Sequence, residues 1–279
     1  MQDVKFFSHE SPHSHSGNSR RHLMKVVILC GGTGTRLREE TEFRPKPMVK
    51  IGGKPILWHI MKHYAYHGFN QFILCLGYKG EVIKEYFYHY MLHNNDVTVK
   101  LGQDRKITVH ESSQTEDWEI TLVDTGENTL KGARIHKIQK YIDDDFMVTY
   151  GDGVSDINIL DLVEYHKKHG KIGTVTGVSP RSSYGQIKHK NGKVSGFVEK
   201  PKIEEGIING GFFVFQKKIF DYLNSNNDCD FEIGPLEQLT KDDQLMGYHH
   251  KGDWACMDTY RDSVFLNSLW DKGKAFWKL

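Results

Sequence analysis

Residue types that bind phosphate oxygens occur close together near the start of the chain. Gly31, Gly32 and Gly34 are followed by Arg36. Glycine lets backbone N–H groups approach a ligand, and successive N–H groups form a concave anion site. A guanidinium adds a charged fork that matches phosphate oxygens. Further on, Lys46 stands between two prolines, which restrain the backbone that presents its ammonium. The pattern predicts a site for a phosphate-bearing ligand.

Two common phosphate-binding motifs do not fit this stretch. A Walker A loop needs Gly-Lys-Ser/Thr, which is missing here, and a dinucleotide fingerprint needs a third glycine where this chain has Thr35-Arg36-Leu37. A hydride-transferring Rossmann protein is therefore disfavoured. A glycine-rich stretch by itself is about as often an ordinary turn between a strand and a helix, so that alternative stays open on these residues alone.

An acidic residue lies in a comparable position further along the chain. Asp152 stands between Gly151 and Gly153, directly after the apolar run 146–150. A carboxylate flanked by glycines at a strand end can point into a cleft, where it could bind a metal ion. The alternative is that Asp152 caps the next helix, although Ser155 and Asp156 are closer to the expected start of that helix.

The elements that must position these residues alternate between strands and helices. Continuous apolar runs bounded by glycine predict buried strands, and apolar residues at helical spacing predict amphipathic helices. The expected strands are 26–30, 72–76, 146–150, 172–178 and 208–215, and the expected helices are 55–66, 82–91, 130–142 and 159–169. This order predicts a doubly wound, mostly parallel, Rossmann-like α/β sheet with right-handed crossovers. In such sheets ligands bind beyond the carboxyl ends of the strands.

Two further regions read as β-hairpin inserts and one as helical. Short strands are expected at 97–101, 107–109 and 119–123, with the polar run 111–117 as an exposed loop or hairpin arm. Residues 185–197 alternate like a hairpin around Asn191-Gly192, a strong two-residue turn signal. The chain after residue 217 predicts helices at 219–223, near 236–239 and at 262–270. We therefore expect an α/β core over 24–216 and a short C-terminal helical region over 217–279.

Residues 1–23 have a different composition from the rest. His9, His13, His15 and His22 alternate with Ser, Pro, Gly and Arg, and little in this stretch is apolar after Phe7. Such a segment cannot bury enough apolar surface to offset the entropy cost of ordering, so we expect it to be disordered. A histidine-based metal site is the less favoured alternative. The folded domain is expected to span residues 24–279.

Composition excludes several classes of partner. The net charge of +1 provides no field that would attract nucleic acid, and no apolar run approaches the roughly 20 residues of a membrane span. The four cysteines show no close metal-type spacing, and Cys30 and Cys75 lie in apolar runs. With no secretory signal apparent, we expect a reduced, cytoplasmic setting. We also expect a homo-oligomer.

Taken together, Gly-Gly-x-Gly-x-Arg-Leu at 31–37 and Pro-Lys-Pro at 45–47 closely resemble the signature of nucleotidyltransferases that activate sugar 1-phosphates. The resemblance covers residue 24 to the C-terminus. Relatives that transfer thymidylyl groups carry Pro-Asp-Gly-Leu-Ala before the strand that precedes the metal ligand. Here the corresponding stretch, 121–126, reads Thr-Leu-Val-Asp-Thr-Gly and resembles the branch that transfers cytidylyl groups to glucose 1-phosphate.

The resemblance implies roles for particular residues. Arg36 and Lys46 would be catalytic, Asp152 and Asp258 would hold Mg²⁺, and Asp258 is singled out by the resemblance alone, because it could equally cap a helix. The remaining implied sites are a nucleotide site (Leu29, Gly31, Gly32, Gly34, Thr35, Arg36, Lys46, Gly126, Arg134) and a sugar-phosphate site (Tyr150, Glu199, Lys200, Asn209).

Several of these assignments have plain structural alternatives. Tyr150 could belong to the core, and Arg134 could lie on a solvated helix face or bind nucleotide, even across a subunit contact. Glu199-Lys200-Pro201 could be a solvated strand end.

The resemblance implies the transfer of CMP from CTP to α-D-glucose 1-phosphate, giving CDP-glucose and pyrophosphate. The attacking phosphate has a second pKa of about 6, so it is largely ionised at neutral pH and needs no general base. The protein must then align the reactants and neutralise developing negative charge. Two alternatives remain: the same chemistry with another nucleotide or sugar 1-phosphate, such as thymidylyl or uridylyl transfer, and a catalytically idle nucleotide-sugar sensor.

Overall fold

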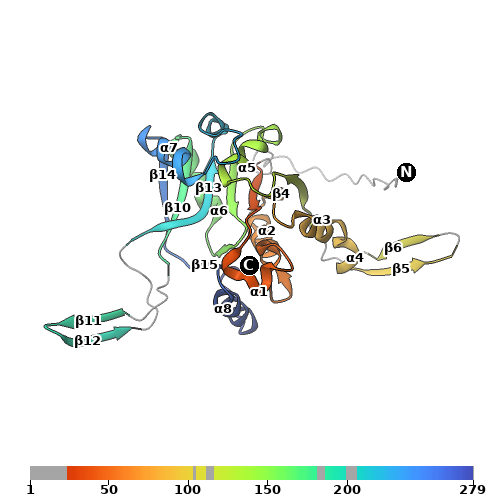
Figure 1. Cartoon of the computed structure of the whole chain (residues 1–279), viewed down its shortest axis with the longest axis horizontal. Coiled ribbons are helices and arrows are strands. Elements are labelled where there is room, and N and C mark those ends of the chain that lie inside the picture. Colours follow the sequence, from red (N-terminus) through yellow and green to blue (C-terminus); the bar gives the residue numbers. More distant parts are fainter. Residues whose placement is uncertain (1–23, 103–104, 111–115, 181–185, 199–205, 279) are drawn as a thin grey trace.

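The structure is a computed structural model that describes residues 24–102, 105–110, 116–180, 186–198 and 206–278 (Figure 1). The expected disorder of residues 1–23, the core of the loop expected at 111–117, and the candidate residues Glu199 and Lys200 lie outside the described residues. Within these ranges, none of the helices combines the length and the apolar character that a membrane crossing requires.

Seven strands of the described chain form one central sheet, in the order β14-β10-β13-β8-β1-β4-β7. Neighbouring strands run parallel except at β13, which is antiparallel to both β10 and β8. The predicted fold class, a mostly parallel doubly wound α/β sheet, is confirmed. The strands are β1 (Val26–Cys30), β4 (Gln71–Leu76), β7 (Glu119–Asp124), β8 (Phe146–Tyr150), β10 (Gly173–Val178), β13 (Ile208–Phe215) and β14 (Leu245–His250).

The central strands are mainly apolar because both faces of the sheet are covered. Along β1, Val26 and Ile28 face one cluster of buried side chains, and Val27 and Leu29 face the other. The first cluster is packed by α2 (Ile56–Tyr66), α6 (Ile159–His169) and α8 (Tyr260–Asp271), and the second by α5 (Lys131–Lys137) and the 3₁₀ helix η5 (Lys217–Tyr222). The apolar periodicity of the helices and the continuous apolar runs of the strands therefore both reflect this three-layer packing.

The strand expected at 119–123 as part of an insert is instead β7, at one edge of the central sheet. Two hairpins extend away from the body of the molecule, as expected for inserts (Figure 1). One pairs β5 (Asp96–Lys100) with β6 (Lys106–His110), and the other pairs β11 (Gln186–Lys190) with β12 (Lys193–Val198). The second turns at Asn191 and Gly192, which both have positive φ, as a two-residue hairpin turn requires.

The single helix expected at 82–91 is wrong in one respect. It is two helices, α3 (Gly80–Tyr88) and α4 (Tyr90–Asn94), because the backbone leaves the helical region at His89, where φ is −94° and ψ is 7°. The helix expected at 130–142 is broken in the same way: α5 ends at Lys137, and the 3₁₀ helix η4 (Gln139–Tyr141) follows past Ile138, where φ is −96° and ψ is 4°. Apolar periodicity continues across both breaks and therefore did not reveal them. The remaining short elements are η2 (Thr35–Leu37), α1 (Arg38–Thr41), η3 (Lys46–Met48), β2 (Lys50–Ile51), β3 (Lys54–Pro55), η6 (Glu232–Leu236) and α7 (Glu237–Lys241).

The C-terminal region contains the expected helices, and it also contains two strands that the sequence analysis did not predict. β14 forms one edge of the central sheet, and β15 (Trp254–Cys256) pairs with β9 (Gly153–Ser155). β14 has the sequence Leu-Met-Gly-Tyr-His-His and is half-exposed, so it shows no clean apolar alternation. β15 has only three residues, and such a short strand is specified by its partner rather than by its own pattern.

Two buried histidines tie helices to the fold. On α2, His63 Nε2 lies 2.7 Å from the Ile157 carbonyl, and on α6, His166 Nδ1 lies 2.8 Å from Thr174 Oγ1. Burial, reinforced by a neighbouring histidine in each case, lowers the pKa of each ring to about 4. Both rings therefore stay neutral in the folded protein at pH values where an exposed histidine is already charged.

Acidification should weaken the fold through these two rings. Between about pH 6.5 and about pH 4 the unfolded chain binds protons that the folded chain does not, so the free energy of unfolding falls as pH falls. Each ring should contribute a slope of about 1.4 kcal/mol per pH unit. Urea denaturation at several pH values in this range measures the slope. His63→Gln should make it shallower and His93→Gln, at an exposed position, should not; equal slopes in all three proteins would contradict the assignment.

Candidate active site

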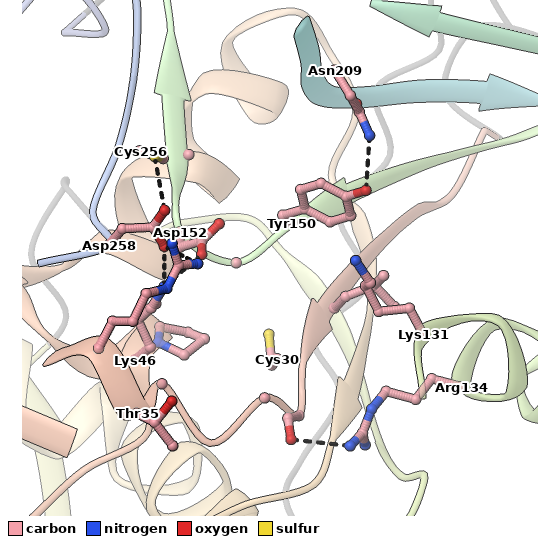
Figure 2. A pocket seen from close by; sticks show the side chains of 18 of the residues that line it. Cys30, Thr35, Lys46, Lys131, Arg134, Tyr150, Asp152, Asn209, Cys256 and Asp258 are labelled. Atoms are coloured by element: carbon pink, nitrogen blue, oxygen red, sulfur yellow. Dashed lines mark hydrogen bonds and ion pairs between the residues drawn. The ribbon is translucent and has the colours of Figure 1, made fainter. Parts of the chain in front are cut away.

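A cavity of about 500 Å³ opens at the carboxyl ends of β1 and β8, the edge where ligands bind in sheets of this type (Figure 2). It brings together most of the residues singled out in the sequence: Leu29, Gly31, Gly32, Gly34, Thr35, Arg36, Lys46, Arg134, Tyr150, Asp152, Asn209 and Asp258. Because β13 runs antiparallel to β8, its beginning lies at this edge, which explains how Asn209 reaches the same cavity.

The centre of the cavity is an ion cluster around Lys46. Its Nζ lies 2.9 Å from Asp152 Oδ2 and 2.7 Å from Asp258 Oδ1, and Arg36 Nη2 lies 3.1 Å from the same Asp258 oxygen (Figure 2). The Lys46 side chain is only 12% exposed, whereas Arg36 is largely in solvent. Two carboxylates and two cationic side chains therefore converge on one point of the cavity wall.

The charges in this cluster adjust each other's protonation. Burial opposes the charge on Lys46, but the charge of Asp152 and the hydrogen bonds to both carboxylates raise the Lys46 pKa above its usual value. Burial likewise opposes ionisation of Asp258, yet the hydrogen bond and charge of Lys46, followed by the charge of Arg36, hold the pKa of that carboxyl below its usual range. The ammonium and the carboxylate are thus both fully charged at neutral pH.

The pairing of β9 with β15 brings the Asp152 and Asp258 carboxylates together, although the two residues are far apart in the sequence. Cys256 on β15 faces Gly153 on β9, and the Met257 N–H donates to the Asp152 carbonyl at 2.8 Å. Neither carboxylate caps a helix, which was the alternative in each case. Asn158 caps α6, and Thr259 caps α8 in a capping box with Asp262. Both side chains therefore remain available to the cavity.

At two positions of the glycine-rich loop, Gly31 and Gly34, a side chain would not fit. Gly34 has a φ of +62°, and a Cβ there would lie 2.8 Å from the Thr41 side chain. A Cβ on Gly31 would lie 2.1 Å from the Arg134 guanidinium, which is closer than real atoms approach. The loop can follow this path only where side chains are missing.

Arg134 is 3% exposed, so the solvated helix face that was one alternative is wrong. Its Nη1 donates to the Leu76 and Gly126 carbonyls and to Thr125 Oγ1, and its Nη2 donates to the Gly31 and Glu127 carbonyls, at 2.7–3.0 Å. The guanidinium thereby ties the glycine-rich loop to the turn after β7. Gly126 does not line the cavity. Its carbonyl contributes to the site by accepting a hydrogen bond from Arg134.

The end of the cavity opposite the ion cluster carries the polar side chains of Tyr150 and Asn209, with Lys131 beside them (Figure 2). Tyr150, the last residue of β8, is half-buried, and its hydroxyl accepts a hydrogen bond from Asn209 Nδ2 at 3.0 Å (Figure 2). Tyr150 therefore lines the cavity and also packs against the core, where its ring meets Phe213.

The two carboxylates at Lys46 could hold a divalent ion that prefers oxygen ligands, such as Mg²⁺. The described residues contain no group of three or more His, Cys, Asp and Glu side chains suited to a metal. Mg²⁺ commonly takes one or two protein carboxylates and completes its octahedron with water and substrate phosphates. Cys256, beside Asp258, would be the one soft ligand, but burial, then the charge of Asp258, raises its thiol pKa to about 12. The Cys256 thiol is therefore protonated at neutral pH.

Some cavity residues were not predicted from the sequence. Lys131 lines the cavity from the first turn of α5, and its sequence context is typical of a solvated helix start. Trp254 donates from its indole to the Gly210 carbonyl at 2.8 Å and so anchors the glycine pair that follows Asn209. Trp254 belongs to β15, and without that strand its position could not be inferred.

Known proteins resemble this chain over nearly its whole length. The family model described as "Nucleotidyl transferase" matches residues 25–271. A relative from Salmonella typhimurium (strain LT2), named glucose-1-phosphate cytidylyltransferase, is 49% identical over 91% of this chain and 99% of its own. A Bacillus subtilis (strain 168) protein, whose name contains the same words, is 47% identical over 92% of this chain and 100% of its own.

Solved structures agree with this at the level of fold. A UDP-glucose pyrophosphorylase complexed with UDP-glucose superposes with a TM-score of 0.64, covering 90% of this chain and 99% of that one, at 17% identity. The resemblance noted in the sequence motifs is thus confirmed by independent comparisons: the chain belongs to the nucleotidyl transferase family and is a sugar-phosphate nucleotidyltransferase.

Proposed function

We propose that this enzyme transfers CMP from CTP to α-D-glucose 1-phosphate and releases pyrophosphate. The observation that carries the proposal is the ion cluster of Lys46, Asp152 and Asp258 beside a glycine-rich loop, at one end of a cavity whose other end carries the polar side chains of Tyr150 and Asn209. The choice of CTP and glucose is supported by the names of the relatives that share nearly half of their residues with this chain.

The reaction is a substitution at the α-phosphorus of the nucleotide. A phosphate oxygen of the sugar 1-phosphate attacks that phosphorus, a new P–O bond forms, and the bond to the oxygen that bridges to the β-phosphate breaks. The nucleophile is already ionised at neutral pH, so no side chain has to take a proton from it. The work left to the protein is alignment and the stabilisation of charge on the leaving pyrophosphate.

Arg36 and Lys46 are placed to supply that stabilisation. The Lys46 ammonium lies between the two carboxylates, and Arg36 adds a second positive charge at Asp258. Asp152 and Asp258 would hold Mg²⁺ together with substrate phosphates, and the bound ion would add positive charge on the phosphate oxygens. With the carboxylates engaged by the ion, Lys46 is free to turn toward the triphosphate. The N–H groups of Gly31, Gly32, Gly34 and Thr35 would hold the nucleotide phosphates beside Leu29.

The sugar phosphate is assigned to the opposite end. Tyr150 and Asn209 would meet sugar hydroxyls, Glu199 would do the same, and Lys200 would hold the sugar phosphate. The last two assignments rest on the Glu-Lys-Pro motif alone. Arg134 is assigned to the nucleotide end through the loop that it holds, since its described hydrogen bonds are to the protein itself.

We further propose that the enzyme works in the cytoplasm as a homo-oligomer, with residues 24–279 as its nucleotidyltransferase domain. The four cysteines are all unpaired, which suits a reducing compartment. Support for self-association comes from the β5–β6 arm. Val97 pairs with Val109 and Val99 with Ile107, so one face of an exposed two-stranded arm is apolar. A hairpin of this kind is marginal alone and gains stability when that face is covered, here by a second copy of the chain.

The first test is a matrix of the four common nucleoside triphosphates against several sugar 1-phosphates, read by pyrophosphate release. We expect CTP with α-D-glucose 1-phosphate to give the highest kcat/KM. A preference for another pair would replace the substrate assignment and keep the reaction class. Absence of turnover with every pair, in a protein that still binds a nucleotide sugar, would favour the sensor alternative.

The second test separates the two lysines. Lys46→Ala should lower kcat by a factor on the order of 10²–10³, because one preorganised charge contact to the leaving group is lost. Lys200→Ala should act mainly on the KM for the sugar 1-phosphate, since that phosphate is charged throughout the reaction. Steady-state kinetics with each substrate varied in turn distinguishes the two.

Lys50→Ala is the matched control for Lys46→Ala, because Lys50 is exposed and lies outside the cavity. It should leave both constants within a factor of about two. The roles of the two cavity ends would be reversed if Lys200→Ala raised only the KM for CTP.

The third test concerns the arm. Placing a charge on its apolar face with Val99→Lys should shift the protein toward the monomer in light scattering after size exclusion, because an unpaired ammonium would be buried at the contact. Thr98→Lys, on the other face of the same strand, should leave the mass unchanged. A monomeric wild-type protein would contradict the oligomer, and a V99K protein of unchanged mass would contradict the role of the arm.

A further inference from the structure

Three elements meet beneath the Tyr150 end of the cavity in one hydrogen-bonded chain. The Tyr150 hydroxyl at the end of β8 donates to Glu232 Oε1 at 2.5 Å. Glu232 begins η6, far along the sequence, and the same oxygen accepts a hydrogen bond from Lys131 Nζ at the start of α5. The Lys131 ammonium also lies 5.0 Å from the centre of the Tyr150 ring. None of these partners of Tyr150 is part of the motifs that identify the family.

The carboxylate fixes the direction of the hydrogen bonds. An ionised carboxylate only accepts, so Tyr150 must donate to Glu232. Burial, followed by the charge of Glu232, raises the pKa of Tyr150, which keeps its hydroxyl protonated for this purpose. The Tyr150 oxygen can then only accept from the cavity side, where Asn209 Nδ2 donates to it at 3.0 Å.

Asn209 is in turn held in one orientation. Its Nδ2 points to Tyr150, so its Oδ1 faces the Gly211 N–H, from which it accepts at 2.9 Å. Gly211 has a φ of +78°, and a Cβ there would lie 2.6 Å from the Tyr150 ring, so the turn that supplies this N–H requires glycine. One Asn209 N–H remains for a ligand. The cavity end therefore presents a defined pattern of donors and acceptors.

The Lys131–Glu232 ion pair, which fixes this pattern, is partly buried. Glu232 Oε2 is buried and has no hydrogen-bond partner among the residues that the structure describes. Leaving a carboxylate oxygen unpaired costs stability, and the Lys131 charge offsets that cost on one side only. Because Glu232 is unfavourable for stability at this position, its presence beside the cavity is better explained by a role in the site.

We infer that Glu232, held by Lys131, is a positioning residue that orients Tyr150 and Asn209 and so sets which sugar hydroxyls the enzyme accepts. The inference rests on the proposed function, because it takes this end of the cavity as the sugar site. Glu232 acts through Tyr150 and does not itself line the cavity.

The test is Glu232→Gln, which keeps the shape of the side chain and removes its charge. A glutamine can donate as well as accept, so Tyr150 and Asn209 lose their fixed orientation. We expect the KM for glucose 1-phosphate to rise on the order of tenfold, the usual effect of losing a hydrogen bond to a charged group. The KM for CTP and kcat should stay within a factor of about two, and the preference for glucose 1-phosphate over its C4 epimer, galactose 1-phosphate, should fall.

A double-mutant cycle separates positioning from general support. Once Tyr150→Phe has cut the chain, adding Glu232→Gln should change the sugar KM little further. Lys131→Met, at a half-exposed position, should repeat the pattern of Glu232→Gln and serves if the latter fails to fold. Asp243→Asn removes the charge of the exposed Lys171–Asp243 pair, away from the cavity, and should change neither KM.

Binding measurements distinguish failure of this inference from failure of the proposed function. In calorimetry, Glu232→Gln should weaken CDP-glucose and leave CTP unaffected. If the wild-type protein prefers another nucleotide or sugar, the substrate proposal fails and the same comparison is made with the preferred pair. Equal effects of Glu232→Gln on the nucleotide and on the nucleotide sugar, or additive effects with Tyr150→Phe, would overturn the positioning role.

Discussion

The repulsion between two carboxylates, and its relief by one ammonium, is the constraint on which this site depends. Asp152 and Asp258 come from distant parts of the chain and would repel each other at this separation without Lys46 between them. The β9–β15 pairing holds the carboxylates, and the restrained Pro-Lys-Pro segment holds the ammonium. The acidic pair is thus neutralised within the protein by the Lys46 ammonium together with the Arg36 guanidinium.

Much of the fold could be predicted from the sequence because its signals are local. Residues 26–30, 71–76 and 146–150 are buried on both faces of the sheet, and such strands must be mainly apolar. The Gly-Gly-x-Gly loop and the glycines around Asp152 mark places where the backbone approaches a ligand or another chain segment. The position of these residues at the carboxyl edge of the sheet then followed from topology.

What could not be predicted depends on partners distant in sequence. β14 and β15 are short or half-exposed, and their pairing is set by the strands beside them. The role of Arg134 depends on five oxygen atoms from three segments, so no spacing in the helix that carries it could distinguish a buried guanidinium from a solvated one. Glu232 and Lys131 were missed for the same reason, because each becomes informative only beside Tyr150.

The reversed direction of β13 has a consequence for how the segment before it can change. Val178 at the end of β10 pairs with Ile208 at the start of β13, so the chain leaves the sheet and returns to it side by side. The β11–β12 hairpin lies in the sequence between these two residues, whose pairing holds the ends of the intervening segment together at the active edge. Extending or replacing such a segment costs little closure entropy and leaves the strand register intact. A segment whose ends are joined in this way can be exchanged for another without disturbing the strands that carry Asp152 and the glycine-rich loop.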